Sequence, residues 1–279
     1  MVNEEKWMIE AEHVCYAYDG MEKKALNDVT LKIAGGRKIA FMGENGSGKS
    51  TFFLCLNGIS RPDSGRILID GSPVEYSRKG LLDVRRKVGI VFQEPDDQLF
   101  SASVYQEISF GIMNLGVDEQ TVRREVEQVI RELGITPFQE RPAHALSGGQ
   151  KKQVAIADIL VMHPQIMILD EPAAALDVRH TKMVHEIIEG LTKKGITILM
   201  STHDMDYAYE WADEMVLMHD GQVICQGRTE DVCEDETVLR AAGLDQPAVL
   251  KLYGRLTGRG VIPRREHPPR SLKELEEML

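Results

Sequence analysis

The chain has 279 residues, of which 43% are hydrophobic and 28% charged, which is the composition of a folded protein and not of a collagen-like or disordered one. Its formal net charge of −11 argues against a protein that binds nucleic acid through backbone phosphates, because such binding needs clustered Lys and Arg. The length predicts one domain with a small appended piece.

Cysteine usage and hydropathy both indicate a cytosolic chain. Cys15, Cys55, Cys225 and Cys233 have no CxxC spacing, so we expect reduced, buried thiols. Residues 1–10 lack the basic flank and apolar core of a leader peptide, and no run approaches the roughly 18 to 20 apolar residues that cross a bilayer. Any membrane role is therefore expected to come through a partner.

The first third of the chain reads as strands that lead into one helix. Residues 7–34 hold short alternating runs interrupted by turn residues, which predicts strands. The apolar run 38–42 enters a Gly-rich segment, and a helix is predicted to open at Lys49 and continue through Leu56. Further strands are predicted at residues 66–70 and 88–92.

The middle of the chain predicts a helical insert followed by buried strands. Apolar residues recur at nearly helical spacing from Asp118 to Leu133, and a second helix is predicted over Gly149–Val161. The strands 165–170 and 196–202 are continuously apolar, with a helix over Arg179–Lys194 between them. Alternating helices and buried strands predict an α/β fold with a parallel sheet covered on both faces.

The C-terminal part begins with a hairpin and then changes in character. Residues 214–227 predict a hairpin that turns at Asp220 and Gly221. The stretch 255–270 is rich in Pro, Gly and Arg and reads as a linker, after which Ser271 is predicted to cap a short helix over 272–279.

The segment GENGSGKS, residues 43–50, fits the pattern GxxxxGK[ST] of a phosphate-binding loop. Its glycines allow backbone N–H groups to face phosphate oxygens, Lys49 is expected to reach the β and γ oxygens, and Ser50 is expected to bind Mg²⁺. The position directly after a strand makes an ordinary Gly-rich turn a poor alternative.

Two further motifs add to this loop. IMILDEP, residues 166–172, ends a buried strand with Asp170 directed at a metal and with Glu171 beside it as a candidate base that orients water. LSGGQ, residues 146–150, offers Ser147 and two glycines just ahead of a helix, an arrangement that can also bind an anion. One chain would then carry two phosphate-facing loops, and a resemblance to the ATP-binding cassette family implies that the second loop serves a nucleotide held by another subunit.

These motifs, in this order, resemble the ATP-binding cassette (ABC) family over about residues 7–230. The resemblance implies a RecA-like core with a parallel sheet, an N-terminal antiparallel β subdomain and an ABC-specific helical subdomain. It implies that Gln93 contacts Mg²⁺ and water, that Asp177 lies at the subunit interface, and that His203 is the switch histidine at the γ-phosphate. Tyr18 resembles the residue that stacks on adenine, with Tyr16 as the competing candidate.

The resemblance thus implies a complete set of site residues for ATP and Mg²⁺. The implied catalytic residues are Glu171, His203 and Gln93. The implied metal ligands are Ser50, Gln93 and Asp170. The implied nucleotide contacts are Tyr18, Asn45, Gly46, Ser47, Gly48, Lys49, Ser50, Thr51, Ser147, Gly148, Gly149, Gln150 and Asp177. The implied nucleotide-binding domain covers residues 1–232, with the helical subdomain at about 94–162.

Residues 92–111 and the region around the signature are similar to energy-coupling-factor importers, particularly their cobalt and nickel ATPases. This resemblance implies a peripheral subunit on the cytoplasmic face of the cell membrane, a second ATPase subunit, identical or related, and a transmembrane scaffold with a substrate-binding component. It implies that residues 233–279 are an extension that helps two ATPases stay together; the alternative is a disordered tail. The alternative functions are a vitamin importer ATPase, a soluble ABC assembly ATPase and a small-molecule kinase.

Overall fold

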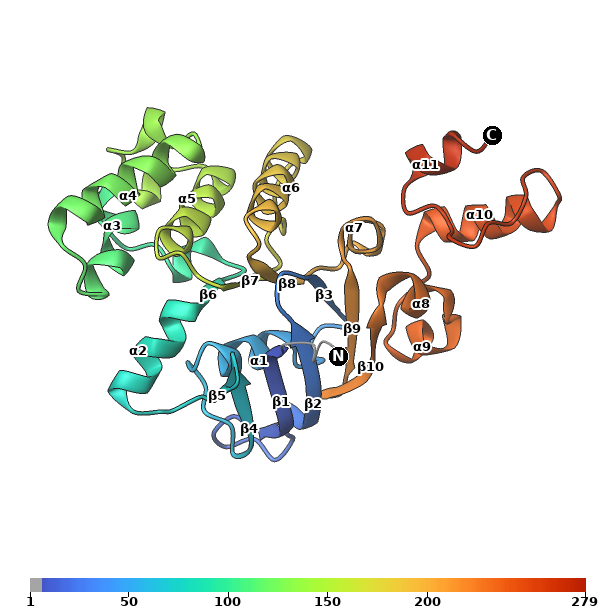
Figure 1. The fold of residues 1–279 in the computed structure, drawn as a ribbon, viewed down its shortest axis with the longest axis horizontal. Coiled ribbons are helices and arrows are strands. Elements are labelled where there is room, and N and C mark those ends of the chain that lie inside the picture. Colours follow the sequence, from blue (N-terminus) through green and yellow to red (C-terminus); the bar gives the residue numbers. More distant parts are fainter. Residues whose placement is uncertain (1–6) are drawn as a thin grey trace, which may run out of the picture.

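The computed structural model describes residues 7–279 and contains two sheets with helices around them (Figure 1). Residues 1–6, which belong to the segment that predicts no leader peptide, lie outside the described residues. Within residues 7–279, no helix is both long enough and apolar enough to cross a bilayer.

The first sheet is antiparallel and comes from the N-terminal part of the chain. Its strands, in order across the sheet, are β2 (Leu26–Ala34), β1 (Trp7–Tyr16), β4 (Ser64–Ile69) and β5 (Ser72–Pro73). Buried and exposed residues alternate along β2, so one face of the sheet packs inward. This face shares a core with α1 (Lys49–Leu56), where the rings of Phe41, Phe52 and Phe53 meet. Helix α1 has the predicted bounds.

The second sheet is parallel except at one edge, as the buried apolar strands predict. Its strands, in order, are β10 (Gln222–Arg228), β9 (Glu214–His219), β3 (Lys38–Met42), β8 (Thr197–Ser201), β7 (Ile166–Asp170) and β6 (Val88–Val91). Strand β10 is antiparallel to β9. The predicted hairpin turn is confirmed, because Asp220 and Gly221 both have the positive φ values, 46° and 75°, that such a turn needs.

Strand register brings three functional segments to one edge of this sheet. Phe41 of β3 and Asp170 of β7 both pair with Ser201 of β8. Because the strands are parallel, the chain leaves all three in the same direction. The Gly-rich loop after β3, Glu171 after β7 and His203 after β8 therefore emerge together at the carboxyl edge.

The remaining helices of the first 211 residues cover the sheets and form the helical insert. They are α2 (Arg78–Lys87), α3 (Val104–Asn114), α4 (Glu119–Glu132), α5 (Gly148–Leu160), α6 (Val178–Lys193) and α7 (Met205–Trp211), with 3₁₀ turns at Pro95–Asp97, Thr136–Phe138 and Ala143–Ala145. Figure 1 shows α3, α4 and α5 gathered on one side of the second sheet. The predicted helices at α4, α5 and α6 are confirmed to within one residue at each end.

Residues 229–279 fold into a helical extension on the other side of α7 (Figure 1). Its helices are α8 (Thr229–Glu234), α9 (Glu236–Ala241), α10 (Ala248–Gly258) and α11 (Leu272–Glu276). The linker prediction is wrong for residues 255–258, because α10 continues through them. Ser271 caps α11 as predicted, since its hydroxyl accepts a hydrogen bond from Glu274 N at 3.2 Å. Ile262 and Leu275 are buried in the main core, which ties the extension to the rest of the chain.

Candidate active site

The Gly-rich loop between β3 and α1 has a backbone that only glycine fits at two positions. Gly43 has a φ of 143°, and a Cβ there would lie 2.1 Å from Met218 O. Gly48 has a φ of 105°, and its Cβ would lie 2.7 Å from Ala25 O. Gly48 is also the N-cap of α1 and supplies no side-chain cap, so the first N–H groups of α1 have no side-chain acceptor at this end. Such a helix start is suited to binding a phosphate.

Lys49 is held inside this loop. Its ammonium donates to Gly43 O at 2.7 Å, to Glu44 O at 3.0 Å and to Ser47 Oγ at 3.3 Å, and the residue is only 6% exposed. Burial lowers the pKa of the Lys49 ammonium, while the negative charges of Glu171 and Asp170 partly oppose that shift. The cation of the phosphate loop and the two predicted carboxylates therefore belong to one electrostatic site.

The two carboxylates are joined by a serine that the sequence motifs did not indicate. Ser201 Oγ donates to Asp170 Oδ1 at 2.5 Å and accepts from Glu171 N at 2.9 Å. Asp170 is buried at the end of β7, and Glu171 has a left-handed φ of 45°, which turns the chain sharply after the strand. The sequence did contain a usable signal for Ser201. This serine lies two residues before His203, at the end of a strand predicted to lie in the same parallel sheet as the strand that ends at Asp170.

Glu171 and His203 lie side by side at this edge. His203 Nε2 is 3.1 Å from Glu171 Oε1, close enough for an ion pair but not aligned as a hydrogen bond. Burial raises the pKa of Glu171, and the neighbouring Asp170 raises it further, whereas His203 and Lys49 lower it. A carboxylate whose pKa is raised, next to a histidine and a lysine, is the environment expected of a base that orients water.

The LSGGQ segment is ordered by its own contacts. Ser147 and Gln150 form a reciprocal cap at the start of α5: Ser147 Oγ accepts from Gln150 N at 3.4 Å and Gln150 Oε1 accepts from Ser147 N at 3.1 Å. Gly149 packs so tightly against α6 that a Cβ there would lie 2.0 Å from the His180 ring. Within residues 7–279, no hydrogen bond or ion pair joins 147–150 to the phosphate loop.

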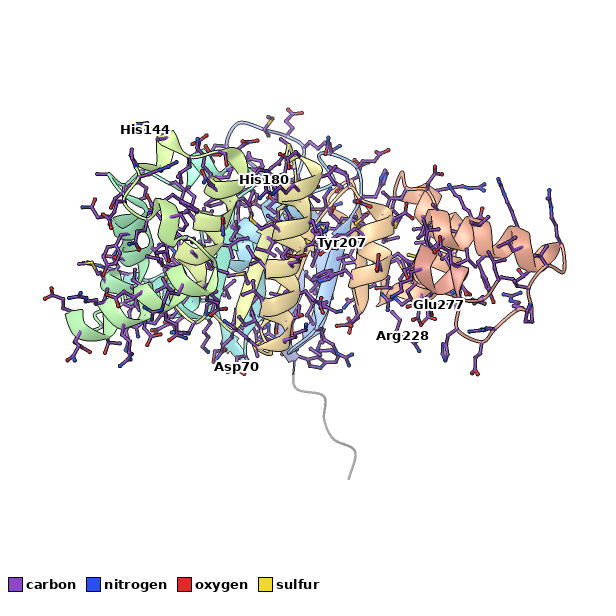
Figure 2. The ribbon with its side chains drawn as sticks, turned by 90° about the horizontal axis from the view of Figure 1, so that it is seen from above. Asp70, His144, His180, Tyr207, Arg228 and Glu277 are labelled. Carbon is purple, nitrogen blue, oxygen red and sulfur yellow. The ribbon has the colours of Figure 1, made fainter. Side chains whose placement is uncertain are left out.

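Asp177 connects this segment to the region after the carboxylates. Its Oδ1 accepts from His180 N at 2.9 Å, capping α6, and its Oδ2 lies 2.8 Å from His180 Nδ1. Figure 2 labels His180 at one end of α6, on the same side of the view as His144, which precedes the LSGGQ segment. Asp177, His180 and Gly149 thus form one cluster, separate from the cluster of Lys49 and the carboxylates.

Comparison with known proteins identifies the family. The family model described as "ABC transporter" matches residues 26–174, more than half of the chain. The chain belongs to the ABC transporter family. The energy-coupling factor transporter ATP-binding protein EcfA of Methanocaldococcus jannaschii is 40% identical, over 92% of each chain. The cobalt import ATP-binding protein CbiO of Rhodobacter capsulatus is 43% identical, over 88% of this chain and 87% of the relative.

A solved structure agrees with these relatives. CbiO1 of Clostridium perfringens, whose structure is described as part of the ABC transporter complex cbiONQ, is 41% identical with a TM-score of 0.75, and the match covers 92% of this chain and 98% of that one. The predicted fold class is confirmed, with its antiparallel N-terminal sheet and largely parallel second sheet. The chain is an ATP-binding, ATP-hydrolysing subunit of an ABC transporter, and these relatives are named energy-coupling factor and cobalt import ATP-binding proteins.

The ABC ATPase places its two candidate adenine residues differently. Tyr18 lies beyond the end of β1, is 44% exposed, and its hydroxyl is 3.0 Å from Thr51 Oγ1 in the first turns of α1. Tyr16 packs against the core and meets Tyr18 edge to face at 5.1 Å. An exposed ring next to the phosphate loop favours Tyr18 as the stacking residue.

Gln93 follows β6 and is exposed, and its backbone is held by a buried lysine. Lys152 Nζ donates to Gln93 O at 2.8 Å and to Phe92 O at 3.0 Å, although Lys152 is only 1% exposed. Burial lowers the pKa of Lys152 to about 8, and the nearby acids, first among them Glu94, oppose that shift. Nothing in the pair Lys151–Lys152 distinguishes the buried lysine from the exposed one, so the sequence could not indicate this contact.

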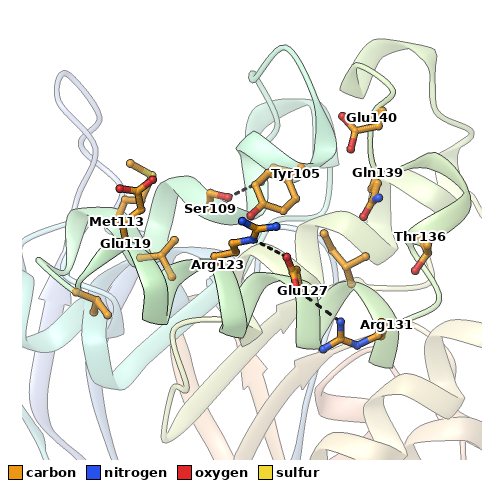
Figure 3. Close-up of a pocket in the computed structure, with 13 residues that line it drawn as sticks. Tyr105, Ser109, Met113, Glu119, Arg123, Glu127, Arg131, Thr136, Gln139 and Glu140 are labelled. Carbon is orange, nitrogen blue, oxygen red and sulfur yellow. Dashed lines mark hydrogen bonds and ion pairs between the residues drawn. The ribbon is translucent and has the colours of Figure 1, made fainter.

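A cavity of about 820 Å³ lies away from these motifs, between α3 and α4 (Figure 3). Tyr105 and Met113 contribute apolar surface, while Arg123, Glu127 and Arg131 form an ion-paired row along α4. None of the predicted site residues lines it. The residues predicted for the ATP site lie at the carboxyl edge of the sheet and around the LSGGQ segment, and not at this cavity.

Proposed function

We propose that this ABC ATPase is the ATP-hydrolysing subunit of an energy-coupling-factor importer that works as a pair of ATPase subunits. The observation that supports a pair is the separation of two clusters in one chain. Lys49, Asp170, Glu171 and His203 share one site. Gly149 of the LSGGQ segment instead packs against His180, which Asp177 contacts. In the proposed dimer, the Ser147 segment of one subunit closes over the ATP held by Lys49 of the other.

The proposed chemistry follows from the groups at the carboxyl edge. Lys49 and the N–H groups of 45–51 bind the phosphates, and Tyr18 stacks on adenine. Glu171 orients the attacking water, and His203 contacts the γ-phosphate and so distinguishes ATP from ADP. Closure with ATP and reopening after hydrolysis supply the mechanical step, because only ATP stabilises the closed pair.

Mg²⁺ fits the oxygen donors at this edge. Ser50, Gln93 and Asp170 are the residues that we propose to hold it, and hydroxyl, amide and carboxylate oxygens are the ligands that Mg²⁺ prefers. When bound, the ion would neutralise charge on the β- and γ-phosphates. Ser201 keeps the Asp170 carboxylate oriented through its 2.5 Å hydrogen bond.

We propose that the segment after Gln93 docks a transmembrane scaffold at the cytoplasmic face of the cell membrane. Phe100 and Phe110 are 70% and 50% exposed and stack edge to face at 5.2 Å, which makes an apolar patch on the surface. Glu107, almost fully buried, fixes this segment by accepting from Phe100 N and Ser101 N at 2.8 and 2.5 Å. A rigid, exposed aromatic pair is typical of a protein interface.

Cobalt or nickel is the cargo that we propose, because one relative is named a cobalt import protein and the matched structure comes from a cbiONQ complex. The test is purification of the tagged chain from gently solubilised native membranes, with identification of its partners by mass spectrometry. We expect a polytopic scaffold with small membrane components, whose identity separates metal from vitamin import. Recovery only with cytosolic partners would overturn the importer proposal.

The docking surface can be tested in the same experiment. The double variant Phe100→Asp/Phe110→Asp is expected to lose at least about 90% of the co-purified scaffold, because hot-spot aromatics at an interface contribute roughly 2 kcal/mol or more each. Leu82→Asp, which changes a 37% exposed leucine on α2, is the matched control and should retain it. Equal recovery with both variants would place the docking surface elsewhere.

A further inference from the structure

Helix α7, which begins two residues after His203, is held at both ends by the C-terminal extension. At its start, Asp206 Oδ1 accepts a hydrogen bond from Ala248 N, the first residue of α10, at 2.6 Å. At its end, the guanidinium of Arg270 donates to the backbone carbonyls of Tyr209 and Ala212. The two contacts come from residues of the extension that are 22 apart in sequence, one at the start of α10 and the other just before α11.

Arg270 contacts the end of α7 through several groups at once. Nε and Nη2 donate to Tyr209 O at 3.1 and 2.6 Å, the guanidinium carbon lies 5.6 Å from the centre of the Tyr209 ring, and Glu230 is 3.6 Å away. A cation on the last carbonyls of a helix satisfies acceptors that have no intrahelical partner and interacts favourably with the helix dipole. A helix of seven residues has little stability of its own, so such contacts decide where it lies.

The extension also reaches the ATP site. His203 and Asp206 line a cavity of about 720 Å³ together with residues 243–248 of the extension. Gly243, at a φ of 71°, lies directly against Glu44 of the phosphate loop, and a Cβ there would be 2.2 Å from Glu44 Oε1. The carbonyl of Glu44 is one of the three acceptors of Lys49. The same turn thus faces both the switch histidine and the loop that holds the cation.

We propose that Arg270 and Asp206 are positioning residues through which the C-terminal extension places His203 against the γ-phosphate. The inference deepens the proposed function and rests on the role proposed there for His203. A change in the position of the extension, for example when two subunits meet, would then alter the preference of the site for ATP over ADP. By reciprocity, ATP would alter the position of the extension.

The test measures equilibrium dissociation constants of ATP and ADP with Mg²⁺, in the Glu171→Gln background so that ATP stays intact. Arg270→Ala and Asp206→Ala are each expected to reduce the preference for ATP by about threefold to tenfold. Arg270→Lys retains a hydrogen-bond donor and Asp206→Asn retains an acceptor, so both variants should keep most of the preference for ATP. Arg264→Ala is the matched control, because the Arg264 side chain has no hydrogen bond or ion pair within the described part of the chain.

A double-mutant cycle with His203→Ala decides whether the effect acts through the histidine. Once His203 is removed, Arg270→Ala should change the preference by less than about twofold. The proposal is overturned if Arg270→Ala and Asp206→Ala fold and keep the full preference while His203→Ala loses it. If His203→Ala keeps the preference, the proposed role of the histidine is itself wrong. If Arg270→Ala fails to fold, Asp206→Ala decides: loss of the preference supports the proposal and an unchanged preference overturns it.

Discussion

Two helices of this ABC ATPase begin at glycine-containing motifs, and the two starts are built in opposite ways. Helix α1 begins at Gly48, which offers no side-chain cap, so its first N–H groups remain available to a ligand. Helix α5 begins at Ser147, whose reciprocal cap with Gln150 satisfies two of these groups within the chain. The start of α1 therefore leaves its N–H groups open to a ligand, whereas the start of α5 is ordered by a cap within a single subunit.

The surroundings of the two helix starts also differ. The start of α1 lies among charges of its own chain, with Lys49 inside the loop and Glu171 close enough to alter its pKa. The start of α5 packs against His180, which Asp177 holds in place. The first start has the chemical groups of a hydrolytic site, and the second has the rigidity of a surface that meets a partner.

The largest expected effect is on ATP turnover, in a variant that lacks the proposed base and keeps both helix starts intact. Glu171→Gln should lower ATP turnover by about 10² to 10⁴-fold, because a positioned base contributes that much, while ATP binding is retained. With hydrolysis blocked, ATP should hold the start of α1 of one subunit against the start of α5 of another. A dimer should therefore accumulate and be detected by size-exclusion chromatography. Undiminished phosphate release would reject the base assignment, and an ATP-loaded monomer would reject the proposed pairing.

A second pair of variants separates the two starts. Lys49→Ala should weaken ATP binding roughly 100-fold, since it removes a charged partner of the phosphates. Ser147→Arg should leave ATP affinity within about twofold and abolish ATP-driven dimerisation, because the added side chain blocks the facing surface. Fluorescent nucleotide titration and light scattering measure the two properties. Ser147→Thr, which keeps the cap, is the control. Equal losses of ATP affinity in Lys49→Ala and Ser147→Arg would contradict the proposed difference between the two helix starts.

Much of this arrangement could be predicted because the motifs are local. The strand before Gly43 and the helix from Lys49 follow from residues that are neighbours in sequence, and α1 has the predicted bounds. The linker interpretation failed at residues 255–258, where α10 continues, and it did not reveal that Arg270 finds its acceptors on Tyr209, 61 residues away. Local composition cannot reveal such a partner. The contact of Lys152 with the backbone of residues 92–93 could not be predicted for the same reason, because the burial of this lysine depends on tertiary structure.

The tight packing at the start of α5 gives a smaller, structural test. Gly149→Ala should cost about 1 to 3 kcal/mol of unfolding free energy, because its Cβ would meet the His180 ring at 2.0 Å and His180 Cβ at 2.9 Å. Gly148→Ala is the matched control: its nearest neighbour, a Leu176 methyl group, would be at an ordinary 3.7 Å. His180→Ala should recover part of the loss in the double variant. Additive effects, measured by denaturant unfolding, would mean that the two residues do not share this contact.

The smallest effect concerns the far end of α5, where Asp158 accepts a hydrogen bond from Gln98 at 3.0 Å. Burial raises the pKa of Asp158 to about 7, from about 4 in an unfolded chain. Between these values the folded protein holds a proton that the unfolded chain releases, so stability falls as the pH rises from about 4 to about 7. Asp158→Asn cannot ionise but keeps an oxygen for Gln98. It should stabilise the fold by at least about 1 kcal/mol at pH 8 and have no effect at pH 4. The control is Asp97→Asn, at an exposed residue next to Gln98, which should leave the unfolding free energy unchanged at both pH values. If Asp158→Asn raised the unfolding free energy equally at both pH values, packing and not ionisation would be responsible.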